Sequence, residues 1–130
     1  MIKHEKRIKQ ILDFRGVGDS KIHPSDIDAV LEFDNQFLIL FEVKLKGVDV
    51  PFGQELLFKR IADSWQKSNG MAFVIYCEHE TDTSEIVTMA NTTVTRIYTQ
   101  GVNYERKENL KECLYKLANH YKITKLINSL

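Results

Sequence analysis

The most regular pattern of apolar and polar residues spans residues 25–44, SDIDAVLEFDNQFLILFEVK. Side chains alternate between the two faces of a β-strand, so residues of one parity share a face. One parity is wholly apolar and contains Ile27, Ala29, Leu31, Phe33, Phe37, Ile39, Phe41 and Val43. The other parity is apolar in its middle and charged at one end. This pattern predicts a β-hairpin whose charged residues gather on one face.

The length of the turn decides which charged residues meet. If residues 34–36 form a three-residue turn, which is common for Asp- and Asn-rich connections, Asp28 lies opposite Glu42 and Asp26 lies opposite Lys44. A two-residue turn would place Glu42 opposite Ile27 and send the carboxylates to different faces. We prefer the three-residue turn because it separates the apolar face from the charged one.

Carboxylates at opposed strand positions, here Asp28 and Glu42, repel each other unless another group offsets their charge. A divalent cation does so, and Mg²⁺ prefers hard oxygen ligands from one or two carboxylates together with water and phosphate. Lys44 shares the face of Glu42 and can reach a metal-bound water or a developing negative charge. The alternative is a solvated strand pair with Lys44 bridged to Asp26, but the apolar middle of this face contradicts it.

An aspartate on one strand followed by Glu-x-Lys on the next resembles the PD-(D/E)xK superfamily of restriction-endonuclease-like nucleases. Asp28 stands fourteen residues before the triplet Glu42-Val43-Lys44. The proline that often precedes the family's aspartate is displaced here, because Pro24 is followed by Ser25 and Asp26. Asp26 is therefore an alternative first acid. The resemblance implies an α/β fold with a restriction-endonuclease-like core, in which helices flank a mixed central β-sheet.

The resemblance also implies an activity. Asp28 and Glu42 are expected to bind Mg²⁺, with Mn²⁺ as a substitute, helped by the Val43 carbonyl, while Lys44 orients or deprotonates the attacking water. Residues 1–77 are similar to short phage- or prophage-encoded members that hydrolyse phosphodiester bonds. We expect a metal-dependent nuclease that acts on DNA and reads structure rather than sequence. The alternative is an inactive nuclease-fold module that binds nucleic acid or protein.

Residues 2–14 show the spacing of a helix, with Gly16 as its first breaker. Glu5 lies on the inward side of this helix. In several branches of the superfamily an acid on the N-terminal helix is an extra metal ligand, so the resemblance implies this role for Glu5. A pairing with Lys9, four residues later, explains Glu5 equally well.

Residues 54–68 carry a second helical pattern, and Gln54 lies on its apolar face. An inward glutamine needs hydrogen-bond partners, and the charged end of the hairpin can supply them. GQELLF also resembles the Gln-led helix that follows the catalytic lysine in exonuclease-like members, which implies a catalytic role for Gln54. The alternative is a polar residue in a frayed first turn. The candidate contacts to nucleic-acid phosphates are Lys46, Lys59 and Arg60.

Later segments complete the expected fold. Residues 71–77 predict a buried strand parallel to the Glu42 strand, and residues 94–99 predict another strand. We interpret residues 78–80 as the start of a solvated loop and residues 82–85 as the cap of a short helix. An amphipathic helix follows over residues 110–121. The apolar stripe of residues 123–130 either packs on the body or mediates self-association, and we predict a homodimer.

Composition changes this picture little. The 130 residues fit a single domain, residues 1–130, and 18 basic residues balance 18 acidic ones. Zero net charge predicts weak non-specific affinity for nucleic acid, although the basic residues concentrate in the half that holds the site. No run reaches transmembrane length and MIKHEKRIKQ lacks an apolar signal core, so we expect a cytoplasmic protein without membrane contact. Cys77 and Cys113 fit buried free thiols.

Overall fold

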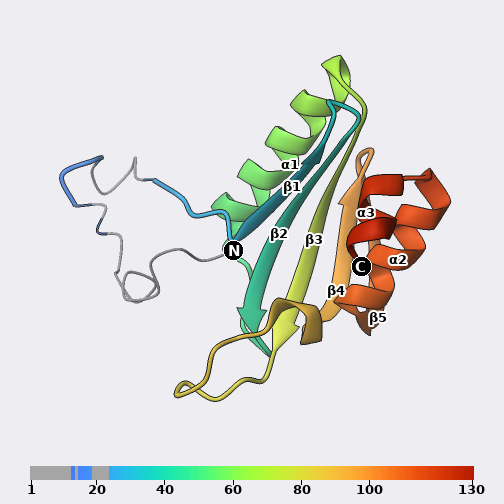
Figure 1. The fold of residues 1–130 in the computed structure, drawn as a ribbon. Coiled ribbons are helices and arrows are strands. Elements are labelled where there is room, and N and C mark those ends of the chain that lie inside the picture. Colours follow the sequence, from blue (N-terminus) through green and yellow to red (C-terminus); the bar gives the residue numbers. More distant parts are fainter. Residues whose placement is uncertain (1–12, 14, 19–23) are drawn as a thin grey trace.

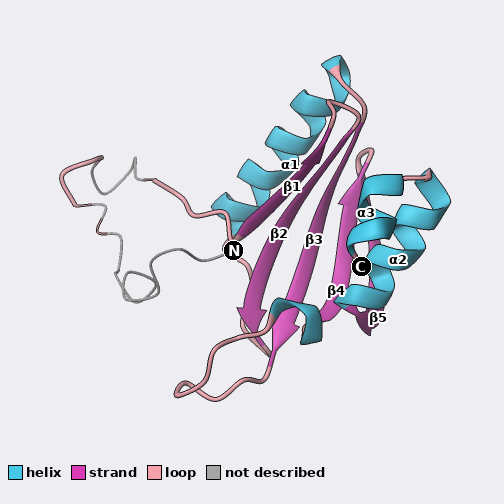
Figure 2. Cartoon of the chain, viewed as in Figure 1, coloured by secondary structure: helices cyan, strands magenta, loops and turns pink. Residues whose placement is uncertain are grey.

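A five-stranded mixed β-sheet forms the centre of the computed structural model, which describes residue 13, residues 15–18 and residues 24–130. The strands lie in sequence order and are β1 Ala29–Phe33, β2 Phe37–Leu45, β3 Met71–His79, β4 Thr93–Thr99 and β5 Val102–Asn109. β2 and β3 are parallel and all other neighbours are antiparallel (Figure 2). The expected α/β fold with a mixed sheet is confirmed.

Helices cover both faces of the sheet (Figure 1). α1, Phe52–Ser68, connects the parallel strands β2 and β3 and lies on one face. α2, Leu110–Tyr121, and α3, Thr124–Ser129, lie on the other face. The short 3₁₀ helix η2, Met89–Asn91, precedes β4. A crossover helix is the usual way to join parallel neighbours, so the position of α1 follows from the strand directions.

The β1–β2 hairpin has the predicted register. Ala29 pairs with Phe41 and Phe33 pairs with Phe37, and the Gln36 amide donates to the Phe33 carbonyl at 2.9 Å to close the three-residue turn. Asp34 and Asn35 adopt the left-handed conformation, with φ of 51° and 59°. Aspartate and asparagine tolerate this conformation better than most residues, which explains why the turn forms here.

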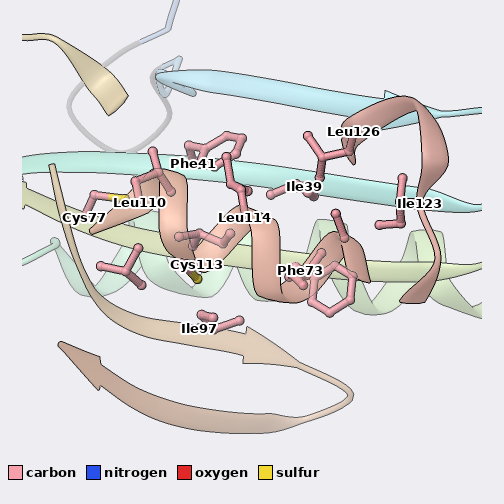
Figure 3. Packing of buried hydrophobic residues seen from close by; sticks show 14 residues of the cluster. Ile39, Phe41, Phe73, Cys77, Ile97, Leu110, Cys113, Leu114, Ile123 and Leu126 are labelled. Carbon is pink, nitrogen blue, oxygen red and sulfur yellow. The ribbon is translucent and has the colours of Figure 1, made fainter. Parts of the chain in front are cut away.

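Two apolar clusters fill the space between the sheet and its helices. The cluster beneath α2 and α3 includes Ile39, Phe41, Phe73, Ile97 and Leu114 (Figure 3). The cluster beneath α1 includes Leu38, Leu40, Phe58, Val74 and Tyr98. β2 and β3 contribute alternate residues to the two clusters, which is why their sequences are almost continuously apolar.

Three expectations from the sequence need correction, and one strand was not predicted. β1 begins at Ala29, so Asp26 and Asp28 precede the strand. Glu78 and His79 continue β3 and do not start a loop. The segment 82–85 forms a turn, with the Ser84 amide bonded to Asp82 Oδ1 at 3.0 Å, because this side chain caps a single turn. Strand β5 was not predicted, because its exposed edge position leaves it largely polar.

The C-terminal stripe packs on the protein's own core. Ile123 and Leu126 are buried in the cluster beneath α2 and α3, and Ile127 and Leu130 pack against it. Self-association is therefore not needed to cover this stripe, and the homodimer stays a prediction.

The expected N-terminal helix over residues 2–14, with Glu5, lies outside the described residues except for Asp13, which is not helical. Cys77 and Cys113 are free and buried, as predicted. None of the helices in the described part of the chain is long and apolar enough to cross a membrane.

Candidate active site

The candidate site lies where β2 and β3 end and α1 begins (Figure 1). Glu42 on β2 pairs with Tyr76 on β3, and Tyr76 pairs with Arg96 on β4. By strand alternation, these three side chains lie on the same face of the sheet as the residues that pack beneath α1. A row of polar side chains therefore crosses three strands at one end of an otherwise apolar face.

Asp28, the residue just before β1, continues this row next to β2. The register places Asp28 opposite Glu42, and Asp28 Oδ2 accepts a hydrogen bond from the Val43 amide at 2.7 Å. This bond holds the exposed Asp28 carboxylate against the end of β2 although Asp28 lies outside the strand. The structure thus brings together the two acids that the sequence predicted to meet.

Glu42 is the most deeply buried carboxylate of the site, with 1% of its surface exposed. Its Oε1 forms an ion pair with Lys44 Nζ at 3.0 Å, and its Oε2 has no hydrogen-bond partner. Burial raises the pKa of Glu42, the bond from Lys44 lowers it, and the neighbouring Asp28 charge raises it further, so the pKa lies above its usual value. Glu42 is therefore a buried carboxylate with one oxygen paired to Lys44 and the other without a partner.

Gln54 lies in the first turn of α1 and faces the same region. Its Nε2 donates to the Asp26 carbonyl at 3.1 Å, whereas its buried Oε1 has no partner. Asp26, the alternative first acid, thus contacts Gln54 through its backbone. Its side chain is exposed, and only Asp28 of the two is bonded to β2 through its carboxylate.

Within the part of the chain that the structure describes, three buried side-chain atoms lack a hydrogen-bond partner: Glu42 Oε2, Gln54 Oε1 and the Tyr76 hydroxyl. All three belong to the polar end of the face beneath α1. An unpaired buried polar atom costs about 1–3 kcal/mol, so such atoms are rare and each needs an explanation. Three of them gathered at one place make this end of the face the candidate site.

Arg96 and its neighbours form the second half of the row. The Arg96 guanidinium carbon lies 4.0 Å from the centre of the Tyr76 ring, and its Nη1 lies 2.6 Å from Glu55 Oε1. Lys59 Nζ also reaches Glu55 Oε1, at 3.2 Å. Burial raises the pKa of Glu55, but the bonds from Arg96 and Lys59 outweigh this effect and lower it. One carboxylate therefore fixes two cations beside the candidate acids.

Sequence reasoning did not assign a role to Tyr76, Glu55 or Arg96. A signal for Arg96 was present, because a charge between Val94 and Tyr98 on one face of a strand is as unusual as Glu42 is in β2. No such signal exists for Tyr76, since a tyrosine in a buried strand is ordinary core composition. Burial raises its pKa to about 12, so the hydroxyl stays protonated at neutral pH.

The three candidate phosphate contacts have different surroundings. Lys46 is exposed and pairs with Glu80 at 2.9 Å. Lys59 is held inward by Glu55 and lies 5.2 Å from the centre of the Tyr98 ring. Arg60 is exposed on α1. Of the three, only Lys59 belongs to the network that includes Arg96.

The donor set suits a hard cation. Asp28 and Glu42 supply carboxylates, and the unpartnered Glu42 Oε2 and Gln54 Oε1 are oxygen donors of the kind that Mg²⁺ prefers. Over the described residues no group of three or more His, Cys, Asp or Glu side chains could hold a metal ion. Mg²⁺ is commonly held by one or two carboxylates, with water and substrate phosphate completing its ligands, so two acids and an amide oxygen fit it.

Comparisons with known proteins found no match to this chain. No protein-family model matches the chain, and no match is found among curated proteins or among solved structures.

Proposed function

We propose that the protein is a Mg²⁺-dependent phosphodiesterase that cleaves nucleic acid, with DNA as its expected substrate. The observation that carries the proposal is the state of Glu42. It is a buried carboxylate with one oxygen on Lys44, the other unpartnered, and Asp28 directly opposite. A buried acid in this state is a costly arrangement for stability and a suitable one for binding a cation.

The order of elements supports the same proposal. A hairpin carries Asp28 and the Glu42-Val43-Lys44 triplet, a crossover helix follows, and the next strand is parallel to β2. This order is the one expected of a restriction-endonuclease-like core, except that the described strands begin with β1, so the usual leading strand of that core is not among them. The two additional strands β4 and β5 extend the sheet beyond it.

The chain's own residues have separable roles in this proposal. Asp28 and Glu42, with the Val43 carbonyl and Gln54 Oε1, would hold the ion, which stabilises charge on the phosphoryl oxygens when bound. Lys44 Nζ is fixed by Glu42 and about one third exposed, so it can orient the attacking water and donate to the developing negative charge. Gln54 also ties α1 to the segment that carries Asp28.

Cleavage assays and calorimetric Mn²⁺ titration on the same preparations test the proposal. A substrate panel of linear duplex, flap, branched and single-stranded DNA, with RNA beside it, defines the activity. We expect Asp28→Ala and Glu42→Ala to lose both Mn²⁺ binding and cleavage. Lys44→Ala is expected to keep Mn²⁺ affinity within a few-fold and to lose cleavage by about 10²- to 10³-fold, the usual loss on removal of a transition-state donor.

Matched control variants lie elsewhere on the surface. Glu32→Gln removes an exposed carboxylate from β1, and Lys111→Ala removes an exposed amine from α2; both are expected to behave as wild type. Mn²⁺ binding unchanged in Glu42→Ala would remove Glu42 as a ligand. Binding of DNA without hydrolysis of any substrate would instead favour the inactive module.

A further inference from the structure

A cleft of about 650 Å³ opens directly beside Lys44. Its lining includes Lys44 and Tyr76, the apolar side chains Val48 and Val50, and Arg96. The lining residues come from β2 to β5, so the cleft spans three strand spacings or about 14 Å. This volume and length suit a ligand the size of one nucleotide.

The charges in the cleft argue against a phosphate as its main occupant. Three basic residues line it, and so do four acidic ones, Asp49, Glu55, Glu78 and Glu105. Glu55 already binds Arg96 and Lys59. The remaining wall offers both donors and acceptors beside two apolar side chains, a mixture that suits a neutral ring with polar edges better than an anion.

Arg96 provides a flat surface for such a ring. Its guanidinium carbon lies over the Tyr76 ring, 4.0 Å from the ring centre, and its Nη1 lies 2.6 Å from Glu55 Oε1. The Arg96 side chain is 28% exposed and lines the cleft, so part of it is open to a ligand there. Nucleobases stack on guanidinium planes, and a plane fixed in advance loses little entropy when it binds.

We propose that this cleft holds one unpaired nucleobase of the substrate, stacked on Arg96, beside the phosphodiester bond that Lys44 addresses. The inference deepens the proposed function and rests on it for the position of that bond. A base held in a duplex cannot enter such a cleft without leaving its stack. The substrate class is therefore single-stranded nucleic acid, or a flap or end with unpaired nucleotides.

Fluorescence anisotropy in EDTA measures binding without cleavage. The probes are a short single-stranded oligonucleotide, the same strand with abasic residues, and the corresponding duplex. The wild-type protein is expected to bind the single strand about tenfold more tightly than either of the other two, the scale of one base stacked on a side chain. Equal affinity for the three probes would overturn the proposal.

Arg96→Lys keeps the charge and removes the plane, so it should abolish the preference for intact bases and leave affinity for the abasic strand unchanged. Arg15→Lys, at an exposed arginine that pairs with Asp13, is the matched control and should keep the preference. Arg96→Gln tests the same position if Arg96→Lys does not fold. Loss of affinity for intact and abasic strands alike would overturn the proposal, because it would show a charge contact only.

Hydrolysis of bis(p-nitrophenyl) phosphate with Mn²⁺ separates this inference from the proposed function. This substrate has no base, so its hydrolysis by the wild-type protein reports the phosphodiesterase activity independently of the cleft. Hydrolysis by wild type without any preference for intact bases would overturn the base-binding cleft alone. Preference for intact bases without hydrolysis would overturn the nuclease and support the cleft.

Discussion

The face of the sheet beneath α2 and α3 is apolar along its buried length, whereas the face beneath α1 is apolar at one end and polar at the other. The same strands build both faces. In β2 the neighbours Phe41 and Glu42 are both about 1% exposed and point to opposite sides. Phe41 lies among apolar side chains, while Glu42 keeps an oxygen without a partner.

This difference separates stability from function. The three unpartnered buried atoms of the described chain all lie at the polar end of the α1 face, and that end also carries the ion pairs of Lys44 and Arg96. Burial of apolar surface beneath α2 and α3 stabilises the fold by about 25 cal/mol per Å². The polar end lowers stability locally, and the rest of the fold compensates for it.

The largest expected effect on the free energy of unfolding comes from a substitution on the apolar face. Phe41→Ala should lower the free energy of unfolding by about 3–5 kcal/mol, because it removes a large buried side chain and leaves a cavity. Mn²⁺ affinity per folded molecule should stay within a few-fold of wild type. Urea unfolding and calorimetry check the two parts. A loss of metal affinity in the folded variant would show that the faces are coupled.

A smaller effect concerns the pH dependence of stability on the polar face. The pKa of Glu42 is raised in the folded protein, so the folded state binds more protons than the unfolded one as pH rises from 4.5 through the raised pKa. The free energy of unfolding should therefore fall over that window in metal-free buffer. The size of the fall measures how far folding raises the pKa of Glu42.

Glu42→Gln should remove this fall, since the amide does not titrate. Addition of Mn²⁺ to the wild-type protein at the upper end of the window should reverse it, because the ion binds the ionised form. Urea unfolding at several pH values, with and without Mn²⁺, is the measurement. An unchanged pH profile in Glu42→Gln would assign the effect to another group.

The smallest effect compares two tyrosines on the same face. Tyr76→Phe removes an unpartnered hydroxyl and should raise Tm by about 2–4 °C. Tyr98→Phe removes a hydroxyl that contacts both oxygens of Asp63, at 2.8 and 2.9 Å, and should lower Tm by a similar amount. Calorimetry on both variants is the test. Destabilisation of equal size in both would mean that the Tyr76 hydroxyl has a partner.

Local pattern predicted much of the fold. Alternation along residues 25–44 gave the hairpin and its register, and the helical spacing of residues 54–68 and 110–121 located α1 and α2 closely. The position of β5 could not be predicted, since a strand on the edge of a sheet is paired on one side only and needs little apolar surface. Whether the stripe of residues 123–130 stays on its own core also depended on tertiary packing.

By itself, the sequence determined that Asp28, Glu42 and Lys44 share one face, because side-chain direction alternates strictly along a strand and the turn fixes the register. Only the tertiary structure decided what surrounds them. The alignment of β3 and β4 placed Tyr76 and Arg96 in the same row, and the start of α1 placed Gln54 and Glu55 over it. The physical reason is range: alternation acts between neighbouring residues, whereas burial and the loss of hydrogen-bond partners arise only when distant segments pack together.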